Sequence, residues 1–165
     1  MTAEMLTEIL DALLSLPAET EVVEFKKAER NFDDRELGQY FSALSNEANL
    51  RSKPCAWLVF GVENGTHQVV GTQYKNTRPA LDAMKKKVAD QTTGRHTFVE
   101  IHELWYMNGK RVVMFEIPPA PAGIPIAFQD HYYGRDGESL QGLSIEKLER
   151  IRMQAAAKDW SAEIL

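Results

Sequence analysis

Residues 55–62 read Cys55-Ala-Trp-Leu-Val-Phe-Gly-Val62, a run that is apolar at odd and even positions alike. Successive side chains of a β-strand point to opposite faces of a sheet, so this run needs cover on both faces. We therefore expect a central strand with layers of structure on either side. Asn64-Gly65 follows directly and predicts a turn, after which residues 68–71 are expected to form a hairpin partner.

Further strands and helices are indicated on both sides of this run. Val23 and Phe25 alternate with Glu24 and Lys26, which predicts a strand with one face against a core, from which Glu24 projects. Asn108-Gly109 separates two alternating stretches and predicts a hairpin. We expect helices over residues 4–15, 78–92, 144–158 and from a cap at Asp33 or Asp34 to Ala48, and strands over 22–26, 97–106, 110–117, 126–128 and 131–135.

These elements predict one domain that mixes helices and strands (α/β in the broad sense), of the α+β class. It should hold a mixed, largely antiparallel sheet with three or four packed helices. The length of 165 residues and the 44% hydrophobic composition suit a single domain over residues 1–165, with a core over 17–142. The chain stops at Trp160-Ser-Ala-Glu-Ile-Leu165 without a helix cap or polar tail, so we expect the N-terminal part of a longer protein.

Cellular location and partners are constrained by composition. Cys55 is the only cysteine, and no signal segment or bilayer-spanning apolar run is present, which predicts a cytoplasmic protein without membrane contact. The net charge of -5 argues against a protein that coats DNA without specificity. Residues 51–117, however, hold 10 basic and 6 acidic side chains, so the middle of the chain could contact phosphates.

Several well-known chemistries lack their motifs here. The sequence has no Gly-x4-Gly-Lys-Ser/Thr loop for nucleoside triphosphates, no Gly-x-Gly-x-x-Gly fingerprint and no Cys/His cluster at zinc spacing. The four histidines are scattered over different predicted elements, without a neighbouring nucleophile. ATPase, dinucleotide and serine-hydrolase activities therefore have no support.

Three carboxylates could meet at one sheet edge. Glu19 and Glu24 stand five residues apart where the chain enters a predicted strand, and Glu63 follows the central strand. Mg²⁺ and Mn²⁺ prefer such oxygen ligands, and a bound ion could polarise a phosphate or activate water, with Lys26 as a nearby phosphate contact. The alternative is that these residues are solvated charges near loops.

A second polar cluster reads Tyr132-Tyr-Gly-Arg135-Asp-Gly-Glu-Ser139. Aromatic rings beside Arg135 can stack on bases and clamp phosphates, while the glycines allow close approach of a backbone. The alternative is a strand that ends in a tight turn, with Tyr132 or Tyr133 in the core.

Taken together, four segments resemble the Schlafen AlbA-type domain, also described as a divergent AAA domain. They are Glu19-x4-Glu24-Phe25-Lys26, the helix over 37–46, the strand and turn over 57–72, and Pro118-Pro119 with Tyr133-Gly-Arg135-x-Gly137-x-Ser139. The resemblance covers about residues 17–142. It implies nucleic-acid binding, often next to a C-terminal module in bacterial members. In the animal ribonucleases of the family, two glutamates and an aspartate form an acidic triad, and by position these fall on Glu19, Glu24 and either Glu63 or Asn64.

Three functional hypotheses follow. The first is a nucleic-acid-binding domain, for DNA or RNA, of a bacterial transcriptional regulator. The second is an endoribonuclease for structured RNA, with Mg²⁺ or Mn²⁺ held by Glu19, Glu24 and Glu63; otherwise no cofactor is implied. The third is a protein-interaction or homodimerisation module. The phosphate contacts expected under the first hypothesis are Lys26, Lys85, Lys86, Lys87, Lys110, Arg111 and Arg135.

Overall fold

The computed structural model describes the backbone of residues 1–18 and 20–164 and, over the same residues, the side chains up to residue 156. A four-stranded sheet in the order β1-β2-β4-β3 forms its centre. β1 and β2 run parallel, and the other two pairs are antiparallel. The strands of this sheet are β1 (Val23–Lys26), β2 (Ala56–Phe60), β3 (Glu100–Tyr106) and β4 (Lys110–Ile117).

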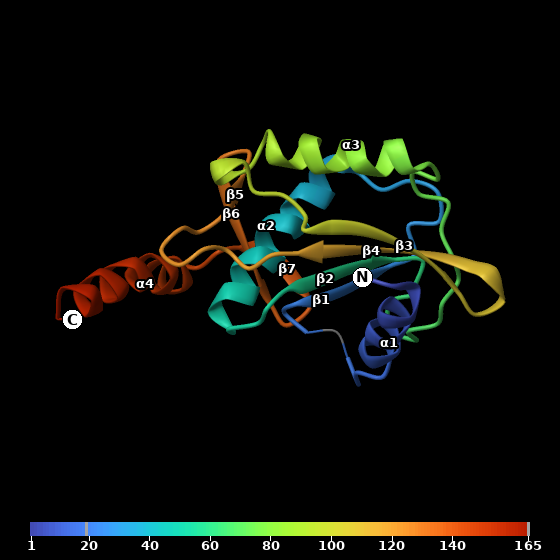
Figure 1. The fold of residues 1–165 in the computed structure, drawn as a ribbon, viewed down its shortest axis with the longest axis horizontal. Helices are drawn as coiled ribbons and strands as arrows, with labels where there is room; N and C mark the ends of the chain where they lie inside the picture. Colours follow the sequence, from blue (N-terminus) through green and yellow to red (C-terminus); the bar gives the residue numbers. More distant parts are fainter. Residues whose placement is uncertain (19, 165) are drawn as a thin grey trace.

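Helices cover both faces of this sheet (Figure 1). α1 (Ala3–Leu14) packs on one face through Leu6 and Leu10. α2 (Asp34–Leu50) and α3 (Arg78–Ala89) pack on the other. Every residue of β2 is buried, as expected for a strand with both faces covered. The run at 55–62 is therefore the central strand that its composition predicts.

The starts of the helices are fixed by capping side chains. Thr2, Asp33 and Thr77 each accept a hydrogen bond from a backbone N–H of the first turn, in α1, α2 and α3 respectively. Of the two caps proposed for the second helix, Asp33 is the one used. The hairpin predicted at Asn108-Gly109 is also present, because both residues adopt positive φ between β3 and β4. Local sequence thus defines these boundaries.

A second sheet, in the order β5-β6-β7, lies against α2. Buried Asn46 of α2 joins it, because its Nδ2 donates to the carbonyl oxygens of Ile126 and Tyr133, both at 2.9 Å, and its Oδ1 accepts from the Ile126 N–H. The strands are β5 (Ala127–Phe128), β6 (His131–Asp136) and β7 (Ser139–Gly142), and α4 (Ile145–Ile164) follows them. α4 extends away from the sheet on the side opposite the β3–β4 hairpin (Figure 1).

The α+β prediction is confirmed, while three details differ. Residues 68–71 contribute only an isolated bridge between Val62 and Val69, so the expected hairpin strand does not form. β7 follows the turn at Gly137 and was not predicted. α4 continues to Ile164, beyond the expected end near residue 158. The side chains at 157–165 lie outside the described residues, and so does the side-chain pattern at the chain end from which we expect a longer protein. Over the described part of the chain, the helices lack the combination of length and apolar character needed to cross a bilayer.

Gly38 offers a test of how closely the second sheet packs on α2. A Cβ atom at this position would lie 2.1 Å from Cε1 of Phe128. We expect Gly38→Ala to lower the free energy of unfolding by about 1–3 kcal/mol, because the overpacking outweighs the gain in helix propensity of about 1 kcal/mol. Urea unfolding would measure it, with Arg35→Ala at an exposed position of α2 as the control. An unchanged midpoint would show that the Phe128 ring can move aside.

Candidate functional site

Glu24, the carboxylate singled out by the sequence, lies on the edge strand β1. Val23 and Phe25 face α1, so alternation places Glu24 on the face covered by α2. Its side chain projects from the sheet, as the pattern predicts, but α2 and β6 cover it and the residue is only 2% exposed. A charge buried to this degree requires partners.

The partners of Glu24 come from three elements. Arg135 of β6 approaches to 2.7 Å through Nη2, Lys26 Nζ lies at 3.3 Å, and the Tyr40 hydroxyl of α2 donates at 3.5 Å. Arg135 also donates to the backbone carbonyl oxygens of Val23 and Glu138, both at 3.3 Å. This ion pair therefore joins β1 of the first sheet directly to β6 of the second.

Glu47 of α2 forms the second half of the same network. It is fully buried, and its Oε2 accepts a hydrogen bond from the backbone N–H of Arg135 at 3.1 Å and another from Lys147 Nζ at 2.7 Å. Lys147, at the start of α4, also donates to the Arg135 carbonyl oxygen at 2.8 Å. We call these five residues, Glu24, Lys26, Glu47, Arg135 and Lys147, the buried ion cluster.

Sequence reasoning missed Glu47 and Lys147. A signal for Glu47 was present, because it follows Tyr40 and Leu44 at helical spacing and so lies on the apolar stripe of α2. A carboxylate in such a stripe requires a buried cation. Lys147 gave no comparable signal, because it is one of several charged residues of both signs at the start of α4.

Electrostatics within the cluster favour the charged form of Lys26. Burial by itself lowers the pKa of Lys26, but the neighbouring Tyr40 phenol and Glu24 carboxylate outweigh burial and raise that pKa above its ordinary value. Burial, and then the Glu24 charge, raise the pKa of Tyr40. Lys26 is thus a cation and Tyr40 a neutral hydrogen-bond donor at neutral pH.

The three-carboxylate metal site is only partly described by the structure. Glu19 lies outside the described residues. Glu63 follows β2 and is half-buried, with its N–H donating to the Gln68 carbonyl oxygen at 2.8 Å. Within residues 1–18 and 20–156, no group of three or more Asp, Glu, His or Cys side chains could hold a metal ion. Because Glu24 is engaged by two cations, its geometry fits a structural role, while the role of Glu19 stays a prediction.

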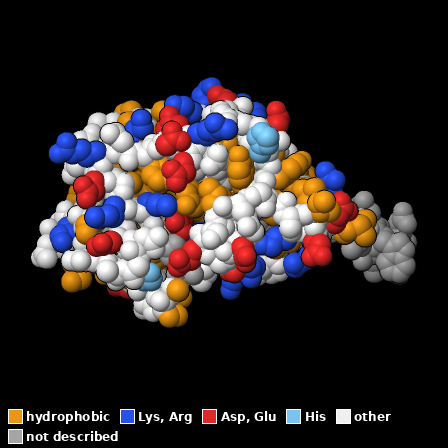
Figure 2. Space-filling view, turned by 180° about the vertical axis from the view of Figure 1, so that it is seen from behind, with side chains coloured by type: hydrophobic (Ala, Val, Ile, Leu, Met, Phe, Trp, Pro, Cys, Tyr) orange, Lys and Arg blue, Asp and Glu red, His pale blue; other side chains and the backbone are white. Residues whose placement is uncertain are grey.

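Of the three lysines of α3, Lys85 is half-buried and Lys86 and Lys87 are exposed, and each has a carboxylate partner. Lys85 Nζ lies 2.6 Å from Glu100, Lys86 Nζ lies 2.7 Å from Asp90, and Lys87 pairs with Asp34. On the face shown in Figure 2, Lys and Arg side chains are likewise interspersed with Asp and Glu. The lysines of α3 therefore do not form a patch of positive charge that lacks neighbouring carboxylates.

Arg111 of β4 points into the protein and is 6% exposed. Its Nε donates to Glu103 at 2.9 Å, and its two terminal nitrogens donate to the carbonyl oxygens of Thr72, Tyr74 and Lys75 at 3.2, 2.8 and 3.0 Å. All five N–H groups of a guanidinium can be used in this way, which a lysine could not match. Arg111 therefore clamps the segment after Gly71 onto the sheet.

Three segments meet beside this clamp, where β1 and β2 end. We call residues 26–32, 70–76 and 109–111 the loop end. The Gln73 N–H donates to the Glu29 carbonyl oxygen at 2.8 Å, and the Thr72 N–H donates to the Arg111 carbonyl oxygen at 2.8 Å. A pocket of about 590 Å³ opens here. The exposed charges of the loop end are four basic side chains, Lys27, Arg30, Lys75 and Lys110, and one acidic side chain, Glu29. Of these, only Lys110 and Glu29 line the pocket.

For residues 132–139, the sequence left two interpretations, an open clamp for nucleic acid and a strand that ends in a tight turn, and the structure shows the turn. β6 ends at Asp136, Gly137 has φ 60°, and β7 returns antiparallel. Tyr132 and Tyr133 are half-buried, and Arg135 is fully buried. Residues 132–139 thus supply strands of the second sheet and the partner of Glu24, and they do not form an open clamp.

Comparison with known proteins places this architecture in a family. A crystal structure of the DIP2311 protein from Corynebacterium diphtheriae superposes with a TM-score of 0.60 at 18% sequence identity, over 92% of this chain and 29% of that one, which shows a shared fold. This chain thus spans less than a third of that protein's length. A search of curated proteins gives no match. The model of the family described as Schlafen, AlbA_2 matches residues 19–144, so the chain belongs to the Schlafen AlbA_2 family.

Proposed function

We propose that this domain binds nucleic acid, with its phosphate contacts at the loop end. Membership of the Schlafen AlbA_2 family fits a nucleic-acid-binding role. The observation that carries the choice of surface is the excess of exposed cations there, Lys27, Arg30, Lys75 and Lys110 against Glu29. Lysine and arginine side chains that neutralise phosphates supply most of the sequence-independent affinity of such proteins.

Lys110 is the strongest single candidate on this surface. Its Nζ donates to the Val69 carbonyl oxygen at 3.3 Å, and no carboxylate of the described residues lies within ion-pair distance of it. Lys85, Lys86 and Lys87 would be weaker contacts, because a phosphate must compete with the carboxylate that each already meets. Arg111 and Arg135 are inside the protein and Lys26 is engaged by Glu24, so the proposed surface leaves these three out.

The wider role proposed is that of the nucleic-acid-binding part of a larger bacterial regulatory protein, as the family resemblance implies. Binding is preferred to cleavage because Glu24, which an endoribonuclease would need for its metal ion, contacts Arg135 and Lys26. Gel shifts with duplex DNA and structured RNA at low and moderate salt test the proposal. The absence of salt-sensitive binding to either would overturn it.

Lys110→Ala and Lys86→Ala form a matched pair for locating the surface. We expect Lys110→Ala to lower affinity for every sequence alike and to reduce the slope of log K against log salt by about 1, as the loss of one phosphate contact should. Lys86→Ala should change both quantities less, because Lys86 is exposed but paired with Asp90. Fluorescence anisotropy titrations over a range of salt concentrations would measure both. A larger effect from Lys86→Ala would move the interface to α3.

A further inference from the structure

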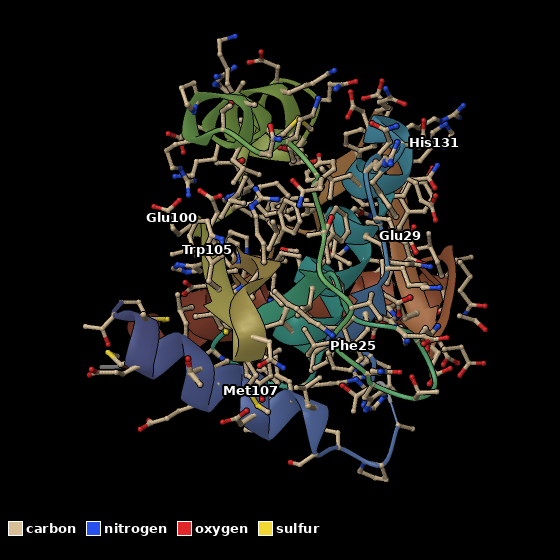
Figure 3. The ribbon with its side chains drawn as sticks, turned by 90° about the vertical axis from the view of Figure 1, so that its right-hand side faces the viewer. Phe25, Glu29, Glu100, Trp105, Met107 and His131 are labelled. Carbon is tan, nitrogen blue, oxygen red and sulfur yellow. The ribbon has the colours of Figure 1, made fainter. Side chains whose placement is uncertain are left out.

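The loop-end pocket has the dimensions of a small-ligand site. Its volume of about 590 Å³ lies within the range of about 300–1,000 Å³ typical of ligand pockets. Its walls come from segments far apart in the sequence, around Glu29, residues 70–76 and the β3–β4 hairpin. Figure 3 looks onto this end of the molecule, with Trp105 and Glu29 on either side of it.

Trp105 is the main apolar wall of this pocket, and it is 62% exposed. It is paired with Arg111 across the hairpin, on the face of the sheet that carries α3. A tryptophan ring left largely in water is a typical platform for a stacked aromatic ligand. Met107, 68% exposed on the same hairpin, instead lies towards α1 (Figure 3) and does not line the pocket.

Another part of the lining presents amide side chains on a fixed backbone. Gln73 and Asn76 line the pocket and are exposed. Between them, Tyr74 is buried, with its ring 4.9 Å from that of Phe60, and Arg111 binds the carbonyl oxygens on both sides of it. An amide offers both a donor and an acceptor, which is the pattern needed to read the edge of a nucleobase. Because the backbone is already held, little ordering would be lost on binding.

The charges of the pocket limit the number of phosphates it can take. Lys110 is the only freely exposed cation among its lining residues that the structure describes, since Arg111 is buried against Glu103. Glu29 contributes a carboxylate, which would repel a polyphosphate but could accept a hydrogen bond from the amino group of a base. The lining therefore suits one base with one adjacent phosphate rather than a nucleoside triphosphate.

We propose that this pocket binds one unpaired nucleotide of a nucleic-acid chain, with its base stacked on Trp105, its edge read by Gln73 and Asn76, and its phosphate held by Lys110. The proposal rests on the nucleic-acid-binding function proposed above and adds a substrate class, single strands or unpaired loops. A base inside a duplex hides both of its faces, so it cannot stack on the ring unless it leaves the helix.

The test uses single-stranded DNA and RNA oligonucleotides that carry 2-aminopurine, with the matching duplexes, and the variants Trp105→Ala, Trp105→Phe and Met107→Ala. We expect Trp105→Ala to weaken binding of the single strands roughly tenfold or more and to abolish the quenching of 2-aminopurine, with little change for duplexes. Trp105→Phe should restore much of the affinity for single strands, because a phenyl ring can still stack on a base, and Met107→Ala should match the wild type. Circular dichroism would confirm that each variant is folded.

The outcomes separate this inference from the proposed function. If Trp105→Ala binds single strands as the wild type does while Lys110→Ala still weakens binding, the nucleotide pocket is wrong and phosphate binding stands. An equal loss for single strands and duplexes would also overturn the stacking role. If the wild type binds no oligonucleotide at any salt concentration, both proposals fail.

Discussion

Glu24→Gln is expected to lower the free energy of unfolding by about 3–5 kcal/mol, because it breaks a buried ion pair and leaves cations near an uncharged amide. The carboxylate is 2% exposed and lies 2.7 Å from Arg135 and 3.3 Å from Lys26. Glutamine keeps the size of the side chain, so the loss would report charge rather than packing. Urea unfolding of the two proteins would measure it.

Two comparisons make this result specific. Glu29→Gln removes an exposed carboxylate whose partner is Lys27 at 3.7 Å, and it should change stability little. A double-mutant cycle of Glu24→Gln with Arg135→Met should show a coupling energy of about 0.5–3 kcal/mol, because the two residues are in direct contact. Additive losses would contradict the pairing.

The same variant distinguishes the structural role from the endoribonuclease hypothesis. If Glu24 holds a metal ion, Glu24→Gln should abolish Mn²⁺- or Mg²⁺-dependent cleavage of structured RNA while leaving the protein nearly as stable as the wild type. If Glu24 supports the junction of the two sheets, the stability falls and no metal-dependent cleavage is lost. Measuring both quantities on one preparation decides between the two roles.

Arg111→Met should have the second largest effect, a loss of about 2–4 kcal/mol in the free energy of unfolding. Methionine preserves the apolar stem, but the variant loses the Glu103 contact and leaves the carbonyl oxygens of Thr72, Tyr74 and Lys75 without their donor. We also expect faster amide hydrogen exchange over residues 72–76, because the clamp that holds this segment is gone.

The control is Arg95→Met, which removes an exposed arginine paired with Asp90 and should leave stability nearly unchanged. If Arg111 instead contacts phosphate, as its place in a basic segment first indicated, Arg111→Met would keep the wild-type stability and lower the salt slope of binding by about 1. Denaturant unfolding and a salt titration together distinguish the two cases.

The sequence was enough to predict what depends on neighbouring residues. The double-sided apolar run at 55–62 defined the central strand, Asn108-Gly109 defined the hairpin, and the Asp33-Asp34 pair marked the start of α2. These signals are local, because alternation, positive φ and capping each involve only a few consecutive residues. The four-segment pattern also gave the family correctly.

Only the tertiary structure decided which charges are available to a partner. Glu24, Arg111 and Arg135 look like solvent-facing charges in the sequence, yet contacts from α2, β6 and residues 72–75 bury all three. In the same way, Lys27, Arg30, Lys75 and Lys110 stand in separate segments and become one surface only where those segments meet. Burial and proximity depend on contacts between residues distant along the chain, which a linear pattern does not encode.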